Sequence, residues 1–363
     1  MPFREPSITG ITLPAGTALF TMHFTMLGLP GSSTLVSFSD YPTPRRIYDP
    51  LVVAHTLTTQ TAQVECVTNA MSLFGNVRLE NGTDLAGVDL VMDLDGVGNR
   101  TSNVSGNFEF GDLTPGGYYS LTPSKTGNHA EGLSVLDLYR IGKHVLGIEP
   151  LPSPYAIIRA DANGSSSITG LDIAELRKLL LGIYSELPSS PAWEFVPAEY
   201  VFPNPSNPFS SPIPGSTLVE EMVASTQRDF IALKVGNVIE TAALGPPLLE
   251  LSAAEATATA ESTVSVPVTI VGGFENLVSM QFSMSWDPAI LQFLGPQGFN
   301  IPSLSAANIY APPGSGTLAL AWTDNNYTGV TVPDGTVMFQ LDFQLIGSPG
   351  AVSPINFTES RSR

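Results

Sequence analysis

The stretch DANGSSSITGLDIAELRKLLLG, residues 161–182, joins a polar loop to an amphipathic helix. Its first twelve residues have the spacing of an EF-hand-type calcium loop, in which oxygen donors recur at positions 1, 3, 5, 7, 9 and 12. The residues at those positions are Asp161, Asn163, Ser165, Ser167, Thr169 and Asp172. Calcium takes six to eight oxygen ligands, so the pattern predicts a calcium site. The alternative is a polar turn capped by Asp172, because Asn-Gly and serine runs are common in loops.

Two positions of this loop depart from the EF-hand pattern. Position 6 is Ser166 where the pattern has glycine, and position 12 is aspartate where it has glutamate. The apolar residues Ile173, Leu176 and Leu179 then recur at helical spacing, which predicts a helix over residues 170–182.

Composition limits the classes of protein to consider. The 363 residues are enough for two or three domains, and a hydrophobic content of 43% supports real cores. The 33 glycines and 31 prolines indicate many turns between short strands. A net charge of −18 argues against a nucleic-acid partner. Cys66 is the only cysteine, so no internal disulfide is expected, and no apolar run approaches the ~20 residues of a membrane span.

A second copy of the loop and helix precedes the first in the chain. The helix-like stretch GLSVLDLYRIGKHVLG, residues 132–147, matches residues 170–182 when Asp137 is aligned with Asp172. This alignment defines a first loop, residues 126–137, with Thr126 at position 1 and Ala130 at position 5. Its candidate oxygen donors are Asn128, Glu131, Ser134 and Asp137.

The duplicated loop–helix of residues 125–187 resembles the type I dockerin module of cellulosome assemblies. The resemblance implies structural calcium and a cohesin partner, which dockerins contact through positions 10, 11, 17, 18 and 22 of each repeat. The polar Ser/Thr pair often found at positions 10 and 11 is absent, which leaves packing within the chain as the alternative. The partner-binding residues that the resemblance implies are Val135, Leu136, Lys143, Leu171, Arg177 and Lys178.

The regions on either side of this module read as β structure. Residues 70–124 alternate short strands with turns, and the run from Gly106 to Tyr118 resembles small prealbumin-like sandwiches of secreted Bacteroidetes-type proteins. Residues 188–245 read as a proline-rich connection followed by a returning strand. The aromatic residues of this connection are expected to fix it to the neighbouring sandwich, with a sugar-binding platform as the alternative. They are Trp193, Phe195, Tyr200 and Phe202.

Residues 246–363 resemble a cohesin domain, a jelly-roll sandwich that binds dockerins. The resemblance is carried by VSVPVTI, residues 264–270, and by Trp286-Asp287-Pro288. Alternation predicts that Val264, Val266, Val268 and Ile270 share one face of a strand.

An internal repeat links the two ends of the chain. Residues 8–38 align without gaps to residues 327–357, pairing Phe20 with Phe339 and Phe24 with Phe343. Residues 1–69 are therefore expected to be the C-terminal part of a second cohesin-like sandwich, and residues 246–363 to lack the last strand. In the first copy the expected strands are Leu19–Leu27, Thr34–Phe38 and a closing strand at Val64–Val67.

These expectations describe a mainly β fold, with jelly-roll or Ig-like sandwiches and a small helical calcium module. No nucleophile elbow, zinc-ligand set or phosphate loop occurs, so no enzyme activity is expected. The predicted function is calcium-stabilised cohesin/dockerin-type assembly, as a scaffold or adhesin, in a fragment of a secreted bacterial protein of polysaccharide breakdown. The alternatives are carbohydrate binding by the sandwich and purely structural stalk repeats, in which Val135, Leu136 and Leu171 would be buried against the chain itself.

Overall fold

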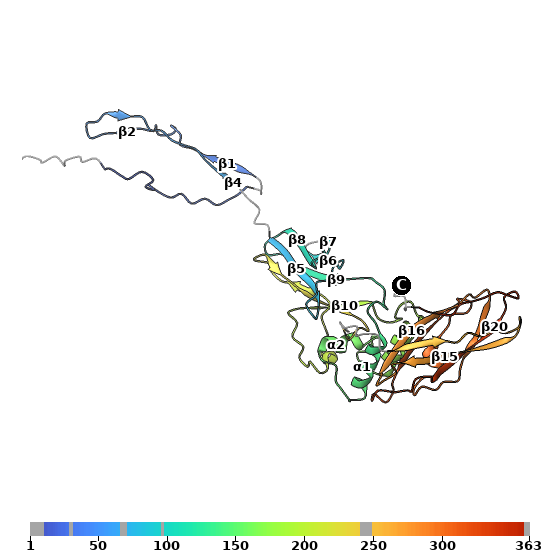
Figure 1. Ribbon diagram of the computed structural model, residues 1–363. Coiled ribbons are helices and arrows are strands. Elements are labelled where there is room, and N and C mark those ends of the chain that lie inside the picture. Colours follow the sequence, from blue (N-terminus) through green and yellow to red (C-terminus); the bar gives the residue numbers. More distant parts are fainter. Residues whose placement is uncertain (1–10, 29–31, 66–70, 96–97, 240–248, 359–363) are drawn as a thin grey trace, which may run out of the picture. The chain divides into compact units, whose positions relative to one another are not determined.

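The structure is a computed structural model that describes residues 11–28, 32–65, 71–95, 98–239 and 249–358. The chain divides into two compact units, Met1–Met71 and Ser72–Arg363. Strands outnumber helices among the described residues, and the described helices all lie in the second unit (Figure 1). The expected mainly β class is confirmed.

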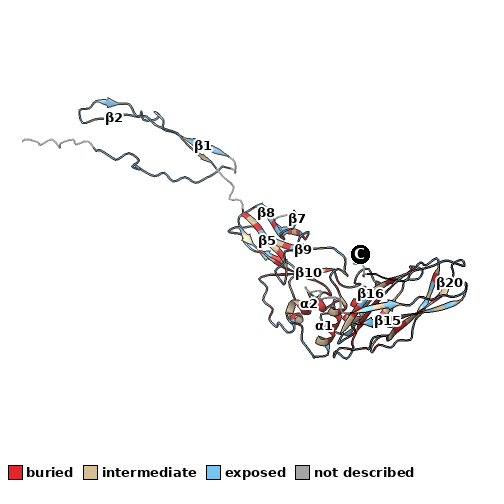
Figure 2. Ribbon diagram, in the orientation of Figure 1, coloured by how far each residue is buried: buried red, intermediate tan, exposed pale blue. Residues whose placement is uncertain are grey.

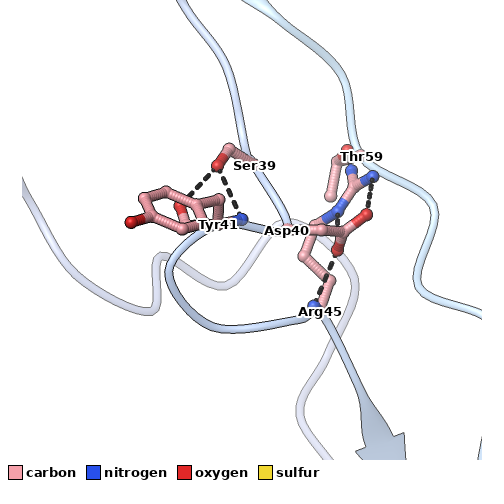
Figure 3. Close-up of polar contacts among 5 residues, drawn as sticks. All are labelled: Ser39, Asp40, Tyr41, Arg45 and Thr59. Atoms are coloured by element: carbon pink, nitrogen blue, oxygen red, sulfur yellow. Dashed lines mark hydrogen bonds and ion pairs between the residues drawn. The ribbon is translucent and has the colours of Figure 1, made fainter.

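The first unit contains two short antiparallel ladders. Strand β1 (Ser33–Val36) pairs with β4 (Ala62–Glu65), and β2 (Ile47–Tyr48) pairs with β3 (Ala54–His55). Between them, the Arg45 side chain holds a loop together. Its Nε lies 3.1 Å from Asp40 Oδ1, and its Nη1 donates to Thr59 Oγ1 at 2.6 Å (Figure 3). The Arg45 and Asp40 side chains are exposed to solvent, so their ion pair orders the loop without adding much stability.

The strand predicted for Leu19–Leu27 is wrong, because residues 19–27 have no β structure. Phe20 and Phe24 are 63% and 60% exposed. Figure 2 colours the described residues of this unit mostly as exposed. Within the described part of this unit no strand pairs with the segment, so its alternating side chains have no core to enter. The other two predicted strands overlap β1 and β4, each of which begins one or two residues earlier than predicted. Cys66 and Val67 lie outside the described residues.

Two sheets form the first sandwich of the second unit. One has the strand order β10-β13-β5-β12, with β8 also paired to β5, and the other has the order β11-β9-β6-β7. The strands that precede the helices are β5 (Met71–Leu79), β6 (Asp89–Leu94), β7 (Gly98–Thr101), β8 (Asn107–Leu113) and β9 (Tyr119–Ser124). Those that follow them are β10 (Trp193–Pro197), β11 (Thr217–Val219), β12 (Thr226–Gln227) and β13 (Phe230–Lys234).

Residues 188–245 therefore contribute more than a connection and one returning strand. Their four strands complete both sheets, and β13 lies between β10 and β5 with every residue buried. A short 3-10 helix, η1 (Pro208–Ser210), lies in the proline-rich part. Sequence pattern missed β11 and β12 because strands of two or three residues carry no readable periodicity, and it missed the five-residue β10 because this strand lies in a proline-rich stretch.

The second sandwich consists of two four-stranded sheets in the described residues, with orders β14-β15-β20-β17 and β18-β19-β16-β21. The strands are β14 (Glu250–Ala253), β15 (Thr263–Gly272), β16 (Ser279–Ser285), β17 (Leu291–Gln297), β18 (Ile309–Tyr310), β19 (Thr317–Thr323), β20 (Val337–Leu345) and β21 (Asn356–Thr358); the 3-10 helix η2 is Ala306–Asn308. Along β15, Val266, Val268 and Ile270 are buried, as the alternation predicts. Trp286 and Trp322 are buried in the same core and are not available to stack on a sugar.

Along the chain, three α-helices lie between β9 and β10: α1 (Val135–Val145), α2 (Pro154–Ala160) and α3 (Gly170–Leu180). Helices α1 and α3 occupy the two predicted stretches. Each begins with a capping box, formed by Ser134 with Asp137 and by Thr169 with Asp172. Helix α2 was not predicted, although Ser153 followed by Pro154 is a start signal. Among the described residues, no helix has the length and hydrophobicity needed to cross a bilayer.

Candidate functional site

The second loop closes around the carboxylate of Asp161. This side chain is 6% exposed, and its two oxygens accept the backbone N–H groups of Ser165 at 2.9 Å and of Ser166 at 2.7 Å. The loop is thus wound tightly about its position 1, as an EF-hand-type loop is.

Ser166 adopts the backbone conformation that position 6 of such a loop requires. Its φ is +60°, in the left-handed region that favours glycine. The sharp turn is therefore made without glycine, at a cost of about 1 kcal/mol. The sequence departs from the EF-hand pattern here, and the backbone does not.

Asp172 ties the end of the loop to its beginning. It is fully buried, its Oδ1 accepts from the N–H of Asn163 at 3.2 Å, and its Oδ2 accepts from the N–H of Thr169 at 2.8 Å. The hydroxyl of Ser165 lies 3.1 Å from the carbonyl oxygen of Ser167. All six predicted ligands of this loop therefore belong to one connected network of oxygen atoms and N–H groups.

The electrostatics of this loop favour a cation. Burial raises the pKa of Asp161, and the neighbouring charge of Asp172 raises it further. Burial also raises the pKa of Glu194, and Asp161 adds to that shift. A buried acidic group beside other acidic groups is relieved by a positive ion. Glu194 lies on β10, far along the chain, so loop spacing gave no signal of it.

The donors of the second loop fit calcium better than a transition metal. They are carboxylate, amide, hydroxyl and carbonyl oxygens, the ligands of hard cations. In the part of the chain that the structure describes, no three His, Cys, Asp or Glu side chains gather into a metal-binding group. With Asp161 and Asp172 as its own carboxylates, the loop has the chemistry of a modest calcium site.

The first loop uses its acidic residue differently. Asp137 is 1% exposed, and its Oδ2 accepts both the N–H and the hydroxyl of Ser134 at 2.8 Å. Its Oδ1 accepts the N–H groups of Val238 and Ile239, each at 2.9 Å. The Asn128 amide oxygen accepts from Ala130, and Glu131 is exposed. Asp137 is thus bonded to a segment outside its loop, and positions 1 and 5 of that loop are Thr126 and Ala130, so the calcium proposal below is restricted to the second loop.

A lysine ammonium lies at the first loop. Lys234 Nζ donates to the carbonyl oxygen of Asn128 at 2.6 Å and to that of His129 at 3.2 Å. Burial lowers the pKa of Lys234 to about 8, while Glu131 opposes the shift. A positive group from β13 therefore lies on the carbonyls of this loop, and the spacing of the loop gave no signal of it.

Helices α1 and α3 pack against the second sandwich. Val135 is 4% exposed and packs with Leu181 and Ala321 of β19, and its N–H donates to Gln281 Oε1 of β16 at 2.9 Å. The rings of Tyr139 and Tyr327 lie 5.1 Å apart between centroids. These contacts join the helical module to one face of its own chain's sandwich, and Figure 1 shows α1 beside β16.

The predicted partner-binding residues separate into two groups. Val135 lies at this interface, and the Arg177 guanidinium reaches Thr323 Oγ1 at 3.3 Å. Leu136 is half-buried, whereas Leu171 is 68% exposed. Lys143 pairs with Glu149 and Lys178 with Glu175, each at 2.9 Å. The prediction missed Tyr139, which lies outside the positions that the dockerin resemblance implies.

Comparisons with known proteins give only distant structural likeness. No family model and no curated protein matches the chain. A cohesin of Acetivibrio cellulolyticus scaffoldin B, solved with a dockerin, is 22% identical over 31% of this chain and 86% of its own, with a TM-score of 0.27. The OlpC cohesin–dockerin complex of Clostridium thermocellum is 18% identical over 33% of this chain and 83% of its own, with a TM-score of 0.28. The major pilin subunit BcpA of Bacillus cereus is 8% identical over 80% of this chain and 65% of its own, with a TM-score of 0.23. Scores this low do not indicate what this chain binds.

Proposed function

We propose that this chain is a non-catalytic assembly protein of extracellular polysaccharide breakdown, with a dockerin-like module held by one calcium ion and docked on its own sandwich. The docking part of the proposal rests on the contact of α1 with β16 and β19, centred on Val135 and Ala321. Leu171 is 68% exposed, so part of the predicted partner surface lies outside that contact, which favours assembly over purely structural stalk repeats. The module presents to this sandwich part of the surface that the dockerin resemblance assigns to a partner.

The character of the interface supports a specific contact. It has an apolar centre, Val135 with Leu181 and Ala321, where full burial of an aliphatic side chain contributes about 1.5–3 kcal/mol. A tyrosine pair and the bond from the Val135 N–H to Gln281 flank that centre. Polar contacts of this kind fix the register of two surfaces more than they add affinity.

The calcium part of the proposal rests on the second loop. Its turn at Ser166, its closed network and the raised pKa of Asp161 all fit a bound divalent cation. Extracellular calcium is in the millimolar range that modest oxygen sites of secreted modules use. The acidic chain, with a net charge of −18, is compatible with that environment.

The docking is tested by placing a charge in the interface of the full chain. Ala321→Arg would bury a guanidinium against Val135, and we expect faster hydrogen exchange of the amides of α1 and α3. Ala289→Arg, at an exposed position of the same sandwich, is the matched control. Unchanged exchange in α1 for Ala321→Arg, with the sandwich still folded, would show that this contact does not form in solution.

A further inference from the structure

A cavity of about 420 Å³ lies beside the first loop, between the loop and the first sandwich. Its polar and aromatic lining residues are Lys125, Glu131, Arg159, Trp193, Lys234 and Asn237. This volume is within the range of small-ligand pockets. The cavity is separate from the second loop and from the helix–sandwich interface.

The lining is basic in a strongly acidic protein. Three cationic side chains face one carboxylate, Glu131, although the chain has 33 acidic and 15 basic residues. Arg159 is paired with Glu80 at 2.9 Å. The two lysines instead donate to carbonyl oxygens, which accept hydrogen bonds without cancelling the charge.

Lys125 is the lysine with a donor to spare. Its Nζ donates to the carbonyl oxygens of Ala86 at 2.9 Å and Gly87 at 3.0 Å, and an ammonium has three N–H donors. Lys234 directs its donors to Asn128, His129 and, at 3.5 Å, Ala192. Lys234 therefore adds positive potential to the cavity, and Lys125 can also donate to a ligand.

The remaining lining offers an acceptor and an aromatic ring. The buried Asn237 Oδ1 has no hydrogen-bond partner among the described residues, a state that costs about 1–3 kcal/mol. Trp193 is half-buried, and Lys234 Nζ lies 5.5 Å from its ring centroid. Rotation of the Asn237 amide would turn its oxygen toward a ligand hydroxyl, and a sugar ring could lie against the exposed part of the indole.

We propose that this cavity binds a hydroxylated carboxylate, specifically a uronic acid residue of an acidic polysaccharide. The carboxylate would take the third N–H of Lys125 in the field of Lys234, and a hydroxyl would donate to Asn237. This site goes beyond the assembly function, because it needs neither the calcium loop nor the docked helices.

The first experiment is calorimetric titration of the full chain, in calcium, with glucuronate, glucose and acetate. We expect glucuronate to bind at least tenfold more tightly than either of the others, since each lacks one of the two recognised groups. Equal binding of acetate would reduce the cavity to a simple anion site, and equal binding of glucose would remove the role of the lysines. Absence of glucuronate binding would overturn the proposal.

The second experiment uses variants with matched controls. Asn237→Asp preserves shape but places a negative charge in the cavity, and we expect glucuronate affinity to fall at least tenfold. Asn99→Asp adds the same charge at an exposed position of β7 and should leave affinity unchanged. Lys125→Gln should also weaken binding, and it keeps the test open if Asn237→Asp fails to fold. Full binding by Lys125→Gln and by a folded Asn237→Asp would refute the proposed contacts.

Discussion

The first and second loops share a spacing and a helix start, yet the chain brings opposite charges to them. Glu194 lies near Asp161 of the second loop, whereas Lys234 donates to carbonyls of the first. Both side chains come from the same end of one strand pair, in which Trp193 of β10 is opposite Lys234 of β13. The charge around each loop therefore depends on distant strands as well as on the loop's own donors.

The two capping aspartates show the same divergence. Asp172 bonds only within its own loop, to Asn163 and Thr169. Asp137 reaches out of its loop to the N–H groups of Val238 and Ile239. Each is buried, but Asp137 ties its loop to a distant segment of the chain.

Calcium removal should give the largest difference between the two loops, because only the second is proposed to bind the ion. A chelator is expected to lower the melting temperature of the chain, because a site saturated at ~100 Kd contributes roughly 2.7 kcal/mol. Asp161→Ala should abolish the calcium-dependent increment, and the exposed control Asp334→Ala should keep it. Identical calorimetric melting of the parent in calcium and in chelator would contradict calcium as a structural ion.

The lysine of the first loop predicts a dependence on alkaline pH. Below pH 8 both folded and unfolded chains carry the charged Lys234. Between about 8 and its ordinary 10.5 only the folded chain loses the proton. The unfolded state then binds more protons, so stability rises with pH. Relative to Lys234→Met, the parent should gain about 2 kcal/mol between pH 7.5 and 9.5.

Paired denaturant titrations of the parent and Lys234→Met at the two pH values measure this difference. Groups common to both proteins, such as the tyrosines, cancel in it. Glu131 attracts the charged form of Lys234 in the parent and opposes the lowering of its pKa. A difference that stays constant with pH would mean that the ammonium is not held in the folded first loop.

Glycine at position 6 should act in opposite directions in the two loops. Ser166→Gly relieves the left-handed backbone and is expected to stabilise by about 0.5–1 kcal/mol. Position 6 of the first loop is Glu131, for which no positive φ is found, so Glu131→Gly should destabilise by a similar amount. Chemical denaturation of both variants in calcium tests this, and a gain from both would show that the loops share one backbone shape.

Glu194, which loop spacing did not predict, should have only a small effect on calcium affinity. Glu194→Gln removes an acidic group beside Asp161 and should weaken calcium binding a few-fold, by about 0.5–1 kcal/mol. Without calcium the same variant should be more stable than the parent, because a buried acidic group is gone. Calcium titration followed by calorimetry measures both, and an unchanged affinity would place Glu194 outside the field of the loop.

The sequence could predict those features of a loop that depend on residues close by in the chain, but not those that depend on residues from distant strands. The six donors of the second loop and the helix after it lie in one stretch, and the structure brings them together. Glu194 and Lys234 reach the loops through β10 and β13, a pairing that no short-range pattern contains. The sequence of the first loop therefore indicated only a metal site, and it did not predict that Lys234 donates to the carbonyl oxygens of that loop.

The terminal repeat shows the same limit for the fold. Phe339 and Phe343 lie on one face of β20 and are fully buried. Their counterparts Phe20 and Phe24 have the same spacing and are exposed. Alternation states which face a strand would bury, but only neighbouring strands can form the core that receives it.

The contact between Val135 and Ala321 also sets a threshold for competition. Both surfaces belong to one chain, and linked surfaces meet at an effective concentration that can reach the millimolar range. A free module at micromolar concentration must therefore bind about a thousandfold more tightly than the internal surface to displace it. A free module that binds only as tightly as the internal surface would not displace it, and only a much tighter partner would separate the helices from their own sandwich.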